Sequence, residues 1–308
     1  MPNPVILTQD LTKYYGRQRG IEGLDLEVRE GEVFGFLGPN GAGKTTTIRL
    51  LMGLLRPDSG AAEVGGLDCW RDAVEVKKLI GYLPSDFSLD PNLTGGEIIA
   101  YLGHLRGGVD RGYVADLAGR LDLELGRKFR QYSHGNRQKV GIVQAFMHRP
   151  RLLILDEPTT GLDPLMQQVF ANMVHEARND GHTVFLSSHV LSEAERLCDR
   201  VGIIRDGRLV QVGTVEALRD IKRFQIDLTF ARPVPPDEFR SITGVERVDA
   251  QVDGTALRLI VQGDVDAVMK AAAAYPIRSV VSHEPSLEDI FLRYYQEDSP
   301  SGASPGGT

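Results

Sequence analysis

The chain has 308 residues, of which 42% are hydrophobic and 25% charged, which is typical of a soluble globular protein with two domains. The net charge of −7 and the lack of a long basic stripe weigh against nucleic acid as a partner. No apolar run approaches the roughly 18–20 residues that cross a bilayer, and the amino terminus does not resemble a signal peptide. Cys69 and Cys198 lie far apart in the sequence and fit a reducing cytoplasm.

The first 220 residues alternate between predicted strands and helices. Apolar or alternating runs predict strands at residues 5–8, 24–28, 33–37, 78–83, 152–155, 183–186 and 201–204. Helices are predicted at residues 45–55, 165–179 and 191–198, with a turn at 56–60. From 86 to 149 the pattern is helical, with breaks at Gly95, Gly107 and Gly112. This order predicts a mostly parallel α/β sheet with a helical insertion around residues 86–150.

After about Asp220 the pattern becomes that of a small α+β module. Strands are predicted at residues 224–230, 245–252, 256–261 and 277–283, and helices at 235–242 and 265–275. Asp253-Gly254 marks a hairpin turn, and the β-α-β-β-α-β order predicts a ferredoxin-like module over residues 222–297. We expect Ser286 to cap a last helix that carries Leu287, Ile290, Phe291 and Tyr294 on one face. Residues 298–308 are polar and rich in glycine and proline, which predicts a disordered tail.

A glycine-rich turn after the strand at 33–37 matches the phosphate-binding pattern G-x-x-x-x-G-K-[ST]. Its residues are Gly38, Pro39, Asn40, Gly41, Ala42, Gly43, Lys44 and Thr45. Such a loop turns backbone N–H groups onto phosphate oxygens, and the helix that follows adds a favourable dipole. We expect Lys44 to neutralise the β- and γ-phosphates, the Thr45 hydroxyl to bind Mg²⁺, and Thr46 to reach the α-phosphate. The sequence therefore predicts a site for a nucleoside triphosphate.

Two adjacent acids follow the apolar strand at residues 152–155. A buried strand that delivers two carboxylates to its carboxyl end can hold a hydrated Mg²⁺ and a water-activating base beside a phosphate. We expect Asp156 to hold the ion, through water, and Glu157 to orient or deprotonate the attacking water. The bland alternative is that both acids merely end a strand.

A polar turn, Ser133-His134-Gly135-Asn136, precedes an apolar helix upstream of these acids. A single ATPase site would not need this turn, whereas a site shared between two chains would. A serine hydroxyl and backbone N–H groups at the start of a helix suit the binding of a phosphate. The alternative is a plain helix cap.

At this point the chain closely resembles the ATP-binding subunits of ABC transporters, over about residues 3–218. The resemblance implies a P-loop NTPase core of the RecA-like type with a helical subdomain at about 86–150. It also implies that Tyr15, in the run Lys13-Tyr14-Tyr15-Gly16, stacks on adenine. Tyr14 is the second candidate, and a tyrosine of the core is the alternative to both.

The family's signature LSGGQ corresponds to the run from Tyr132 to Asn136. Ser133 and Gly135 are retained, whereas Tyr132, His134 and Asn136 replace leucine, glycine and glutamine. The resemblance implies that this turn, with Asn136 included, clamps the γ-phosphate held by the other subunit.

Two further positions follow from the resemblance. Thr160-Gly161-Leu162-Asp163 corresponds to the loop that couples the two sites of a dimer, with Asp163 as its acid. His189 corresponds to the switch histidine that senses the γ-phosphate, and with Glu157 and Lys44 it completes the implied catalytic set.

One departure from the family concerns Mg²⁺. The family usually has a glutamine where this chain has Ser85, followed by Asp86. Serine is too short to reach as far as glutamine. Either water fills the gap beside Ser85, or Asp86 takes part.

The resemblance implies an ATP hydrolase that uses Mg²⁺ and works as a homodimer. It would power export through separate transmembrane permease subunits, at the cytoplasmic face of the inner membrane. The carboxyl end, from Pro285 to Phe291, resembles that of multidrug and antibiotic-resistance exporters. We expect the docking face among Phe87, Leu89, Leu93 and Tyr101, which could equally be core residues. The competing classes are a soluble ABC-type ATPase that acts on ribosomes or DNA, and a nucleotide-dependent regulator.

Overall fold

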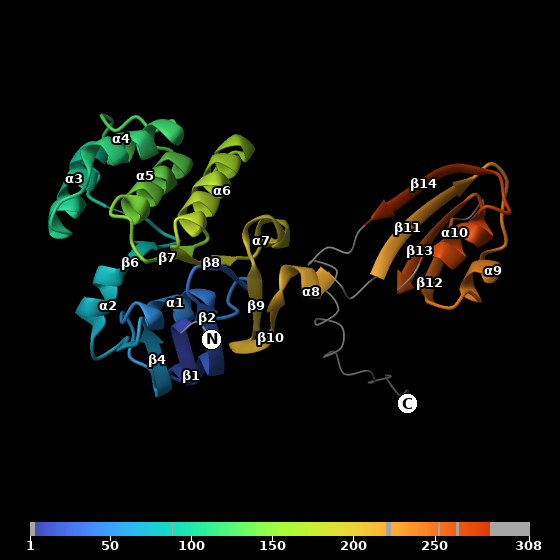
Figure 1. Ribbon diagram of the computed structural model, residues 1–308, viewed down its shortest axis with the longest axis horizontal. Helices are drawn as coiled ribbons and strands as arrows, with labels where there is room; N and C mark the ends of the chain where they lie inside the picture. Colours follow the sequence, from blue (N-terminus) through green and yellow to red (C-terminus); the bar gives the residue numbers. More distant parts are fainter. Residues whose placement is uncertain (1–3, 88, 220–222, 252, 263–264, 284–308) are drawn as a thin grey trace, which may run out of the picture. The chain divides into compact units, whose positions relative to one another are not determined.

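The computed structural model of the protein describes residues 4–87, 89–219, 223–251, 253–262 and 265–283. The chain divides into two compact units, Met1–Thr214 and Val215–Thr308 (Figure 1). This division falls slightly before residue 218, where we expected the first domain to end. The last helix expected from Ser286 and the tail from Asp298 lie outside the described residues.

A six-stranded sheet forms the centre of the first unit, in the strand order β10-β9-β3-β8-β7-β6. Its strands are β3 (Val33–Leu37), β6 (Ile80–Leu83), β7 (Leu152–Asp156), β8 (Thr183–Ser188), β9 (Arg200–Arg205) and β10 (Arg208–Thr214). The strands β9, β3, β8, β7 and β6 run parallel, as predicted, and β10 adds an antiparallel edge that the sequence did not reveal. The carboxyl ends of the parallel strands therefore lie at the same end of the sheet, which is where ligands bind in open α/β sheets.

Both faces of this sheet are buried, as the side chains of β7 illustrate. Leu153 and Leu155 pack among the helices, whereas Leu152 and Ile154 pack in the cluster formed with β1, β2 and α1. Because successive side chains of a strand point to opposite faces, a strand buried on both sides is a continuous apolar run.

A four-stranded antiparallel sheet covers one face of the central sheet, in the order β2-β1-β4-β5 (Figure 1). Its strands are β1 (Pro4–Tyr15), β2 (Gln18–Arg29), β4 (Ser59–Val64) and β5 (Leu67–Asp68). β1 and β2 are much longer than the predicted segments 5–8 and 24–28, because register shifts interrupt their alternation. Their length brings Tyr15 to the end of a strand rather than into a loop.

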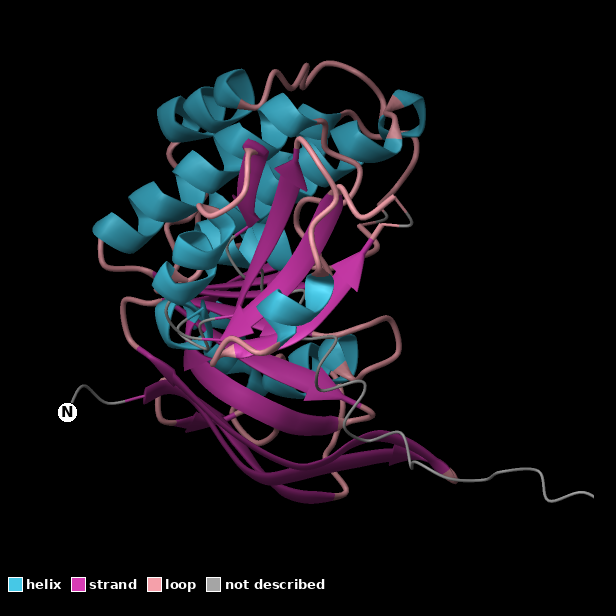
Figure 2. Ribbon diagram, turned by 90° about the vertical axis from the view of Figure 1, so that its right-hand side faces the viewer, coloured by secondary structure: helices cyan, strands magenta, loops and turns pink. Residues whose placement is uncertain are grey.

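Helices cover the other face and also join the strands (Figures 1 and 2). The helices of this unit are α1 (Lys44–Leu51), α2 (Ala73–Leu79), α3 (Gly95–Leu105), α4 (Arg111–Arg120), the 3-10 turn η1 (Phe129–Gln131), α5 (His134–Phe146), α6 (Pro164–Asn179) and α7 (Leu191–Leu197). The predicted insertion comprises α3, α4 and α5, which share a core cluster with α6 and the central sheet.

Three local predictions in this region were wrong. Gly95 begins α3 rather than breaking a helix, since Thr94 caps α3 in a capping box with Glu97. Gly112 lies inside α4, whose cap is Asp110. Lys78 belongs to α2, so β6 starts at Ile80 instead of at residue 78.

The second unit has its own small core. Its elements are α8 (Val215–Arg219), β11 (Arg223–Phe230), α9 (Pro236–Arg240), β12 (Val245–Ala250), β13 (Ala256–Gln262), α10 (Asp266–Ala272) and β14 (Ile277–His283). The strands are antiparallel in the order β12-β13-β11-β14, which confirms the predicted ferredoxin-like module. Phe230, Phe239 and Leu259 are among its buried residues. Across the two units, no helix in the described ranges has the length and apolar character needed to cross a membrane.

Candidate functional site

An open cleft of about 450 Å³ lies where β3 ends and α1 begins. Its lining comes from the ends of β3, β6 and β7, which lie at the same side of the parallel sheet, from the start of α1, and from the end of β1 and the start of β2 in the antiparallel sheet. The lining residues are Tyr15, Gln18, Arg19, Gly20, Asn40, Gly41, Gly43, Lys44, Thr45, Thr46, Ser85, Glu157 and Thr160. Most of the phosphate-loop residues singled out from the sequence are therefore together.

Glycines shape the loop between β3 and α1. Gly41 and Gly43 have φ angles of 82° and 113°, a region that favours glycine. A Cβ atom on Gly38 would lie 2.4 Å from the carbonyl oxygen of Ile204, so the loop packs directly on β9. The loop leads into the amino terminus of α1 at Lys44, where amide groups without a helical partner attract anions.

Lys44 is almost completely buried, with 5% of its surface exposed. Its ammonium group donates to the carbonyl oxygens of Gly38, at 2.6 Å, and Pro39, at 3.1 Å. It also lies 3.2 Å from Oε1 of Glu157. The cation therefore joins the loop to the acid after β7.

Thr45 and Asp156 bring two oxygen-bearing side chains together beside Lys44. The Thr45 hydroxyl donates to Asp156 Oδ2 at 2.9 Å, and the Ser187 hydroxyl donates to Asp156 Oδ1 at 2.5 Å. Carboxylate and hydroxyl oxygens are the ligand types that Mg²⁺ prefers, usually with substrate phosphates completing the shell. The described residues contain no group of three or more His, Cys, Asp or Glu side chains that could hold a metal by themselves.

Glu157 and His189 contact each other where β7 and β8 end. His189 Nδ1 lies 2.5 Å from Glu157 Oε2. Glu157 has a φ angle of 52°, rare for a residue with a side chain, and its N–H donates to the carbonyl and hydroxyl oxygens of Ser187. Gln138 of α5 donates to the carbonyl oxygens of Glu157 and Pro158, at 3.2 and 3.0 Å. These bonds hold Glu157 in an unusual backbone conformation.

The two tyrosines at the end of β1 have different surroundings. Tyr15 lines the cleft, and its hydroxyl lies 3.5 Å from the Thr46 hydroxyl. Tyr14 instead lies near Glu22, and burial together with this carboxylate raises the pKa of its hydroxyl; it is not among the residues that line the cleft.

Ser85 and Asp86 are both exposed after β6. Ser85 lines the cleft, whereas Asp86 is not among its lining residues. The position of Ser85 therefore agrees better with water filling the gap than with direct participation of Asp86.

The polar turn before α5 lies apart from the cleft lining. Ser133 caps α5 by accepting from the N–H of Asn136 at 3.3 Å. A Cβ atom on Gly135 would lie 2.4 Å from the carbonyl oxygen of Gly161, and one on Gly161 would lie 2.4 Å from the His134 ring. His134 and Gly135 therefore pack against the loop that carries Asp163, and none of Ser133, Gly135 and Asn136 lines the cleft of the same chain.

Asp163 acts within this chain as the cap of α6, accepting from the N–H of Met166 at 3.0 Å. Tyr132 explains one change in the signature, because it is buried and donates from its hydroxyl to the carbonyl oxygen of Glu124 at 2.6 Å. Gly95 makes the room, since a Cβ atom there would lie 2.5 Å from that hydroxyl.

Two polar residues around the site were not singled out from the sequence. Gln138 is buried against the loop after β7, and Glu193 is buried between Thr159 and Ser188. Most of their partners lie 19 to 34 residues away in the sequence. The exception is Ser188, which is close to Glu193 in the sequence. No local sequence pattern of the kind used above could have indicated these contacts.

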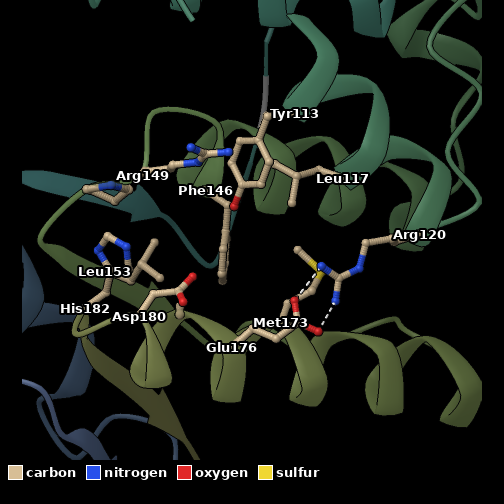
Figure 3. A pocket seen from close by; sticks show the side chains of 12 residues that line it. Tyr113, Leu117, Arg120, Phe146, Arg149, Leu153, Met173, Glu176, Asp180 and His182 are labelled. Atoms are coloured by element: carbon tan, nitrogen blue, oxygen red, sulfur yellow. Dashed lines mark hydrogen bonds and ion pairs between the residues drawn. The ribbon is translucent and has the colours of Figure 1, made fainter. Parts of the chain in front are cut away.

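A second cavity lies between α4, the end of α5 and α6 (Figure 3). Arg120 and Glu176 form a two-pronged ion pair with distances of 2.7 and 2.8 Å, and the Arg149 guanidinium lies 4.2 Å from the centre of the Tyr113 ring. These charged groups have partners within the protein and join the insertion to α6. None of the predicted site residues lines this cavity.

Comparison with known proteins decides the family. Residues 21–160 match the family described as ABC transporter, and residues 213–295 match the carboxyl-terminal domain of DrrA1-3-like ATP-binding proteins. The bacitracin transport ATP-binding protein BcrA of Bacillus licheniformis is 34% identical over 94% of this chain and 96% of its own. The chain belongs to the ABC transporter family of ATP-binding proteins.

Other relatives agree over similar lengths. The daunorubicin resistance ATP-binding protein DrrA3 of Streptomyces coeruleorubidus is 35% identical, covering 97% of this chain and 98% of its own. A solved structure of an ATP-binding subunit of an ABC transporter is 32% identical, with a TM-score of 0.65 over 70% of this chain and 92% of its own. The dimeric cassette MJ0796, at 24% identity and a TM-score of 0.63, shares the fold.

The chain is therefore the ATP-binding, ATP-hydrolysing subunit of an ABC transporter. Subunits of this family dimerise and act with transmembrane permeases. Relatives that match along nearly the whole chain are transport and resistance proteins, which favours this function over action on ribosomes or DNA.

Proposed function

We propose that this subunit powers the export of an antibiotic-like small molecule through separate permease subunits. The observation that carries the proposal is the match of residues 213–295 to the carboxyl-terminal domain of DrrA1-3-like ATP-binding proteins. The relatives named for bacitracin transport, daunorubicin resistance and linearmycin resistance match 94–97% of this chain. The subunit would act at the cytoplasmic face of the inner membrane.

ATP binds in the cleft beside β3. The residues that hold it are Tyr15, which stacks on adenine, and the loop residues Gly38, Pro39, Asn40, Gly41, Ala42, Gly43, Lys44, Thr45 and Thr46. The loop glycines and the start of α1 favour phosphate here, as argued above. Lys44 supplies the positive charge for the β- and γ-phosphates.

Thr45 and Asp156 would hold Mg²⁺, and Ser85 would contribute through water. These residues fit the ion, because the Thr45 hydroxyl and Oδ2 of Asp156 lie 2.9 Å apart. The Ser187 hydroxyl donates to the other carboxylate oxygen, Oδ1, and so fixes the orientation of Asp156. The bound ion would neutralise charge on the phosphate oxygens. The protein's contribution is to keep the Thr45 hydroxyl and the Asp156 carboxylate oriented toward the phosphate loop.

Glu157 and His189 act on the attacking water and on the γ-phosphate. Glu157 accepts the proton of the water, or orients it, from a backbone position fixed by Ser187 and Gln138. His189 contacts the Glu157 carboxylate and would donate to the γ-phosphate.

The second half of each site comes from another copy of the chain. Ser133, Gly135 and Asn136 lie at the start of α5, away from the cleft lining of their own chain, and Ser133 is exposed. Such a turn can meet a phosphate only if a partner supplies it. Asp163 would couple the two sites of this homodimer through its loop.

The permease would dock on α3. Tyr101 and Leu105 are 60% and 67% exposed and lie one turn apart on this helix. Phe87, Leu89 and Leu93, by contrast, pack against the core and serve stability instead.

The hydrolysis step is tested by Glu157→Gln. We expect the turnover number for ATP to fall about 100-fold or more, while ATP still binds, because the carboxylate acts on water rather than on the nucleotide. ATP hydrolysis and equilibrium binding of ATP are measured on the full chain, with Glu75→Gln on the exposed side of α2 as the control. Undiminished hydrolysis in Glu157→Gln would rule out this assignment of Glu157.

The transport role is tested in cells. A strain that produces the subunit together with its permease should tolerate an antibiotic better than one producing Glu157→Gln, and the two subunits should copurify. Copurification with ribosomes in place of a membrane protein would contradict the proposal.

A further inference from the structure

The loops that carry Glu157 and His189 meet at a buried carboxylate outside the cleft. Glu193 lies in the first turn of α7 and is 9% exposed. Its Oε1 accepts from the Thr159 hydroxyl at 2.6 Å, and its Oε2 accepts from the Ser188 hydroxyl at 3.0 Å. One side chain therefore joins the loop after β7 to the end of β8.

Each of the two hydroxyl groups is close to a proposed functional residue. Thr159 follows Glu157 by two residues, in the loop that continues to Asp163. Ser188 directly precedes His189, and its hydroxyl also accepts from the N–H of Val190 at 2.9 Å. The Ser188 hydroxyl is thus bonded to the residue that follows His189, and this bond restrains the backbone around His189.

The chemistry of these bonds suits a carboxylate. A carboxylate only accepts hydrogen bonds, so both hydroxyls donate to it, and a buried carboxylate depends on such bonds. A glutamine side chain has an NH₂ donor in place of one carboxylate oxygen, so one of the two hydroxyls would have to turn and accept instead of donating. The Ser188 hydroxyl already accepts from the N–H of Val190. Glu193→Gln therefore keeps the shape of the side chain but replaces a charge-assisted bond by a weaker, reversed one.

We propose that Glu193 is a positioning residue for ATP hydrolysis. By holding Thr159 and Ser188 in place, it fixes the loops so that Glu157 and His189 stay in contact at 2.5 Å. The inference rests on the proposed roles of Glu157 and His189. Glu193 is not among the residues that line the cleft, so its effect is on turnover and not on nucleotide binding.

The first experiment compares Glu193→Gln with the wild-type full chain. Turnover is expressed per nucleotide-binding site counted in the same preparation, so that unfolded protein does not lower the value. We expect kcat to fall about tenfold or more, with KM for ATP changed less than about twofold. Glu195→Gln makes the same change on the same helix and should keep wild-type turnover.

A second pair of variants keeps the test valid if Glu193→Gln folds poorly. Thr159→Val retains the shape but removes the donor, and should lower kcat in the same manner. Thr159→Ser keeps the hydroxyl and should restore turnover to within about threefold of the wild type. Combining Thr159→Val with Glu193→Gln should cost less than the sum of the two single losses, because both variants act on the same group of contacting side chains.

Three results would overturn the inference. They are a kcat within twofold of the wild type in both Glu193→Gln and Thr159→Val, a loss explained by KM or by fewer binding sites, and a failure of Thr159→Ser to restore turnover. Failure of the roles proposed for Glu157 and His189 would give a different result. Glu157→Gln would then hydrolyse ATP normally, whatever the Glu193 variants do.

Discussion

Tyr14 and Tyr15 are neighbours in the sequence, yet the structure gives them different partners. Tyr15 faces the cleft, and Gly20 of β2 lies directly beneath its ring, where a Cβ atom would be 2.9 Å from Tyr15 Cε2. Tyr14 lies near Glu22. Successive side chains of a strand point to opposite faces, so only one of two adjacent tyrosines can face the nucleotide.

We predict that Tyr15→Ala raises the dissociation constant for ATP about tenfold, since stacking on a base contributes on the order of 1–3 kcal/mol. Tyr15→Phe keeps the ring and should bind like the wild type. Tyr14→Ala is the matched control and should change the dissociation constant less than Tyr15→Ala. Titration with a fluorescent ATP analogue measures all three, and a larger effect of Tyr14→Ala would reverse the assignment.

The sequence revealed the residues of the phosphate loop because they are contiguous. Gly38 to Thr46 form one run between a strand and a helix, and Asp156 and Glu157 end a recognisable apolar strand. Contacts such as Tyr132 with Gly95, or Glu193 with Thr159, join residues far apart in the chain. A single sequence contains no periodic signal for such pairs, so only the folded structure shows them.

At the scale of elements, the best predictions were the strands of the central sheet. They are buried on both faces, which makes them continuous apolar runs. The bulged strands β1 and β2 and the short helix α2 lack such a run, because register shifts or a single buried residue, Val76, blur the pattern. The helix caps of Thr94 and Asp110 explain why Gly95 and Gly112 do not interrupt the insertion.

Two side chains fix the junction of α2 and β6. Arg106, at the end of α3, donates to the carbonyl oxygens of Lys77 and Ile80 at 2.7 and 3.0 Å. His148, after α5, has Nε2 3.3 Å from the Ile80 oxygen. Burial lowers the pKa of His148 to about 4, and the nearby Arg106 charge adds to the effect. The histidine is therefore neutral in the folded protein.

We predict that His148 makes the protein less stable at acidic pH. Its folded pKa of about 4 lies below the unfolded value of 6.5, so the unfolded chain binds more protons between these limits. The contribution to stability is fully present above pH 6.5 and is lost as the pH falls toward 4. His148→Gln should have a flatter dependence of melting temperature on pH in this window, and equal slopes for both proteins would contradict the prediction.

At the scale of the whole molecule, the two units have separate hydrophobic clusters. The cluster around Phe230, Phe239 and Leu259 draws all its residues from the second unit. Every residue that lines the cleft lies at or before Thr160. All the residues that line the cleft therefore come from the first unit.

We predict that a chain ending at Asp220 binds ATP with a dissociation constant within about twofold of the full chain, because it retains the whole cleft. We also expect the shortened chain to dimerise less readily or to hydrolyse ATP at a different rate. Calorimetric titration, sedimentation and an ATPase assay make the comparison. Unchanged dimerisation and hydrolysis would remove any role for the second unit in either process.

The buried ammonium group of Lys44 has a consequence for affinity. It already has three partners in its own chain, the carbonyl oxygens of Gly38 and Pro39 and the carboxylate of Glu157. A phosphate that enters the cleft must take the place of at least one of them, so these groups are internal competitors of the ligand. The measured affinity for ATP therefore reflects a difference between two sets of contacts with oxygen atoms. It depends on the strength of the contacts that Lys44 gives up as much as on the strength of those that it gains.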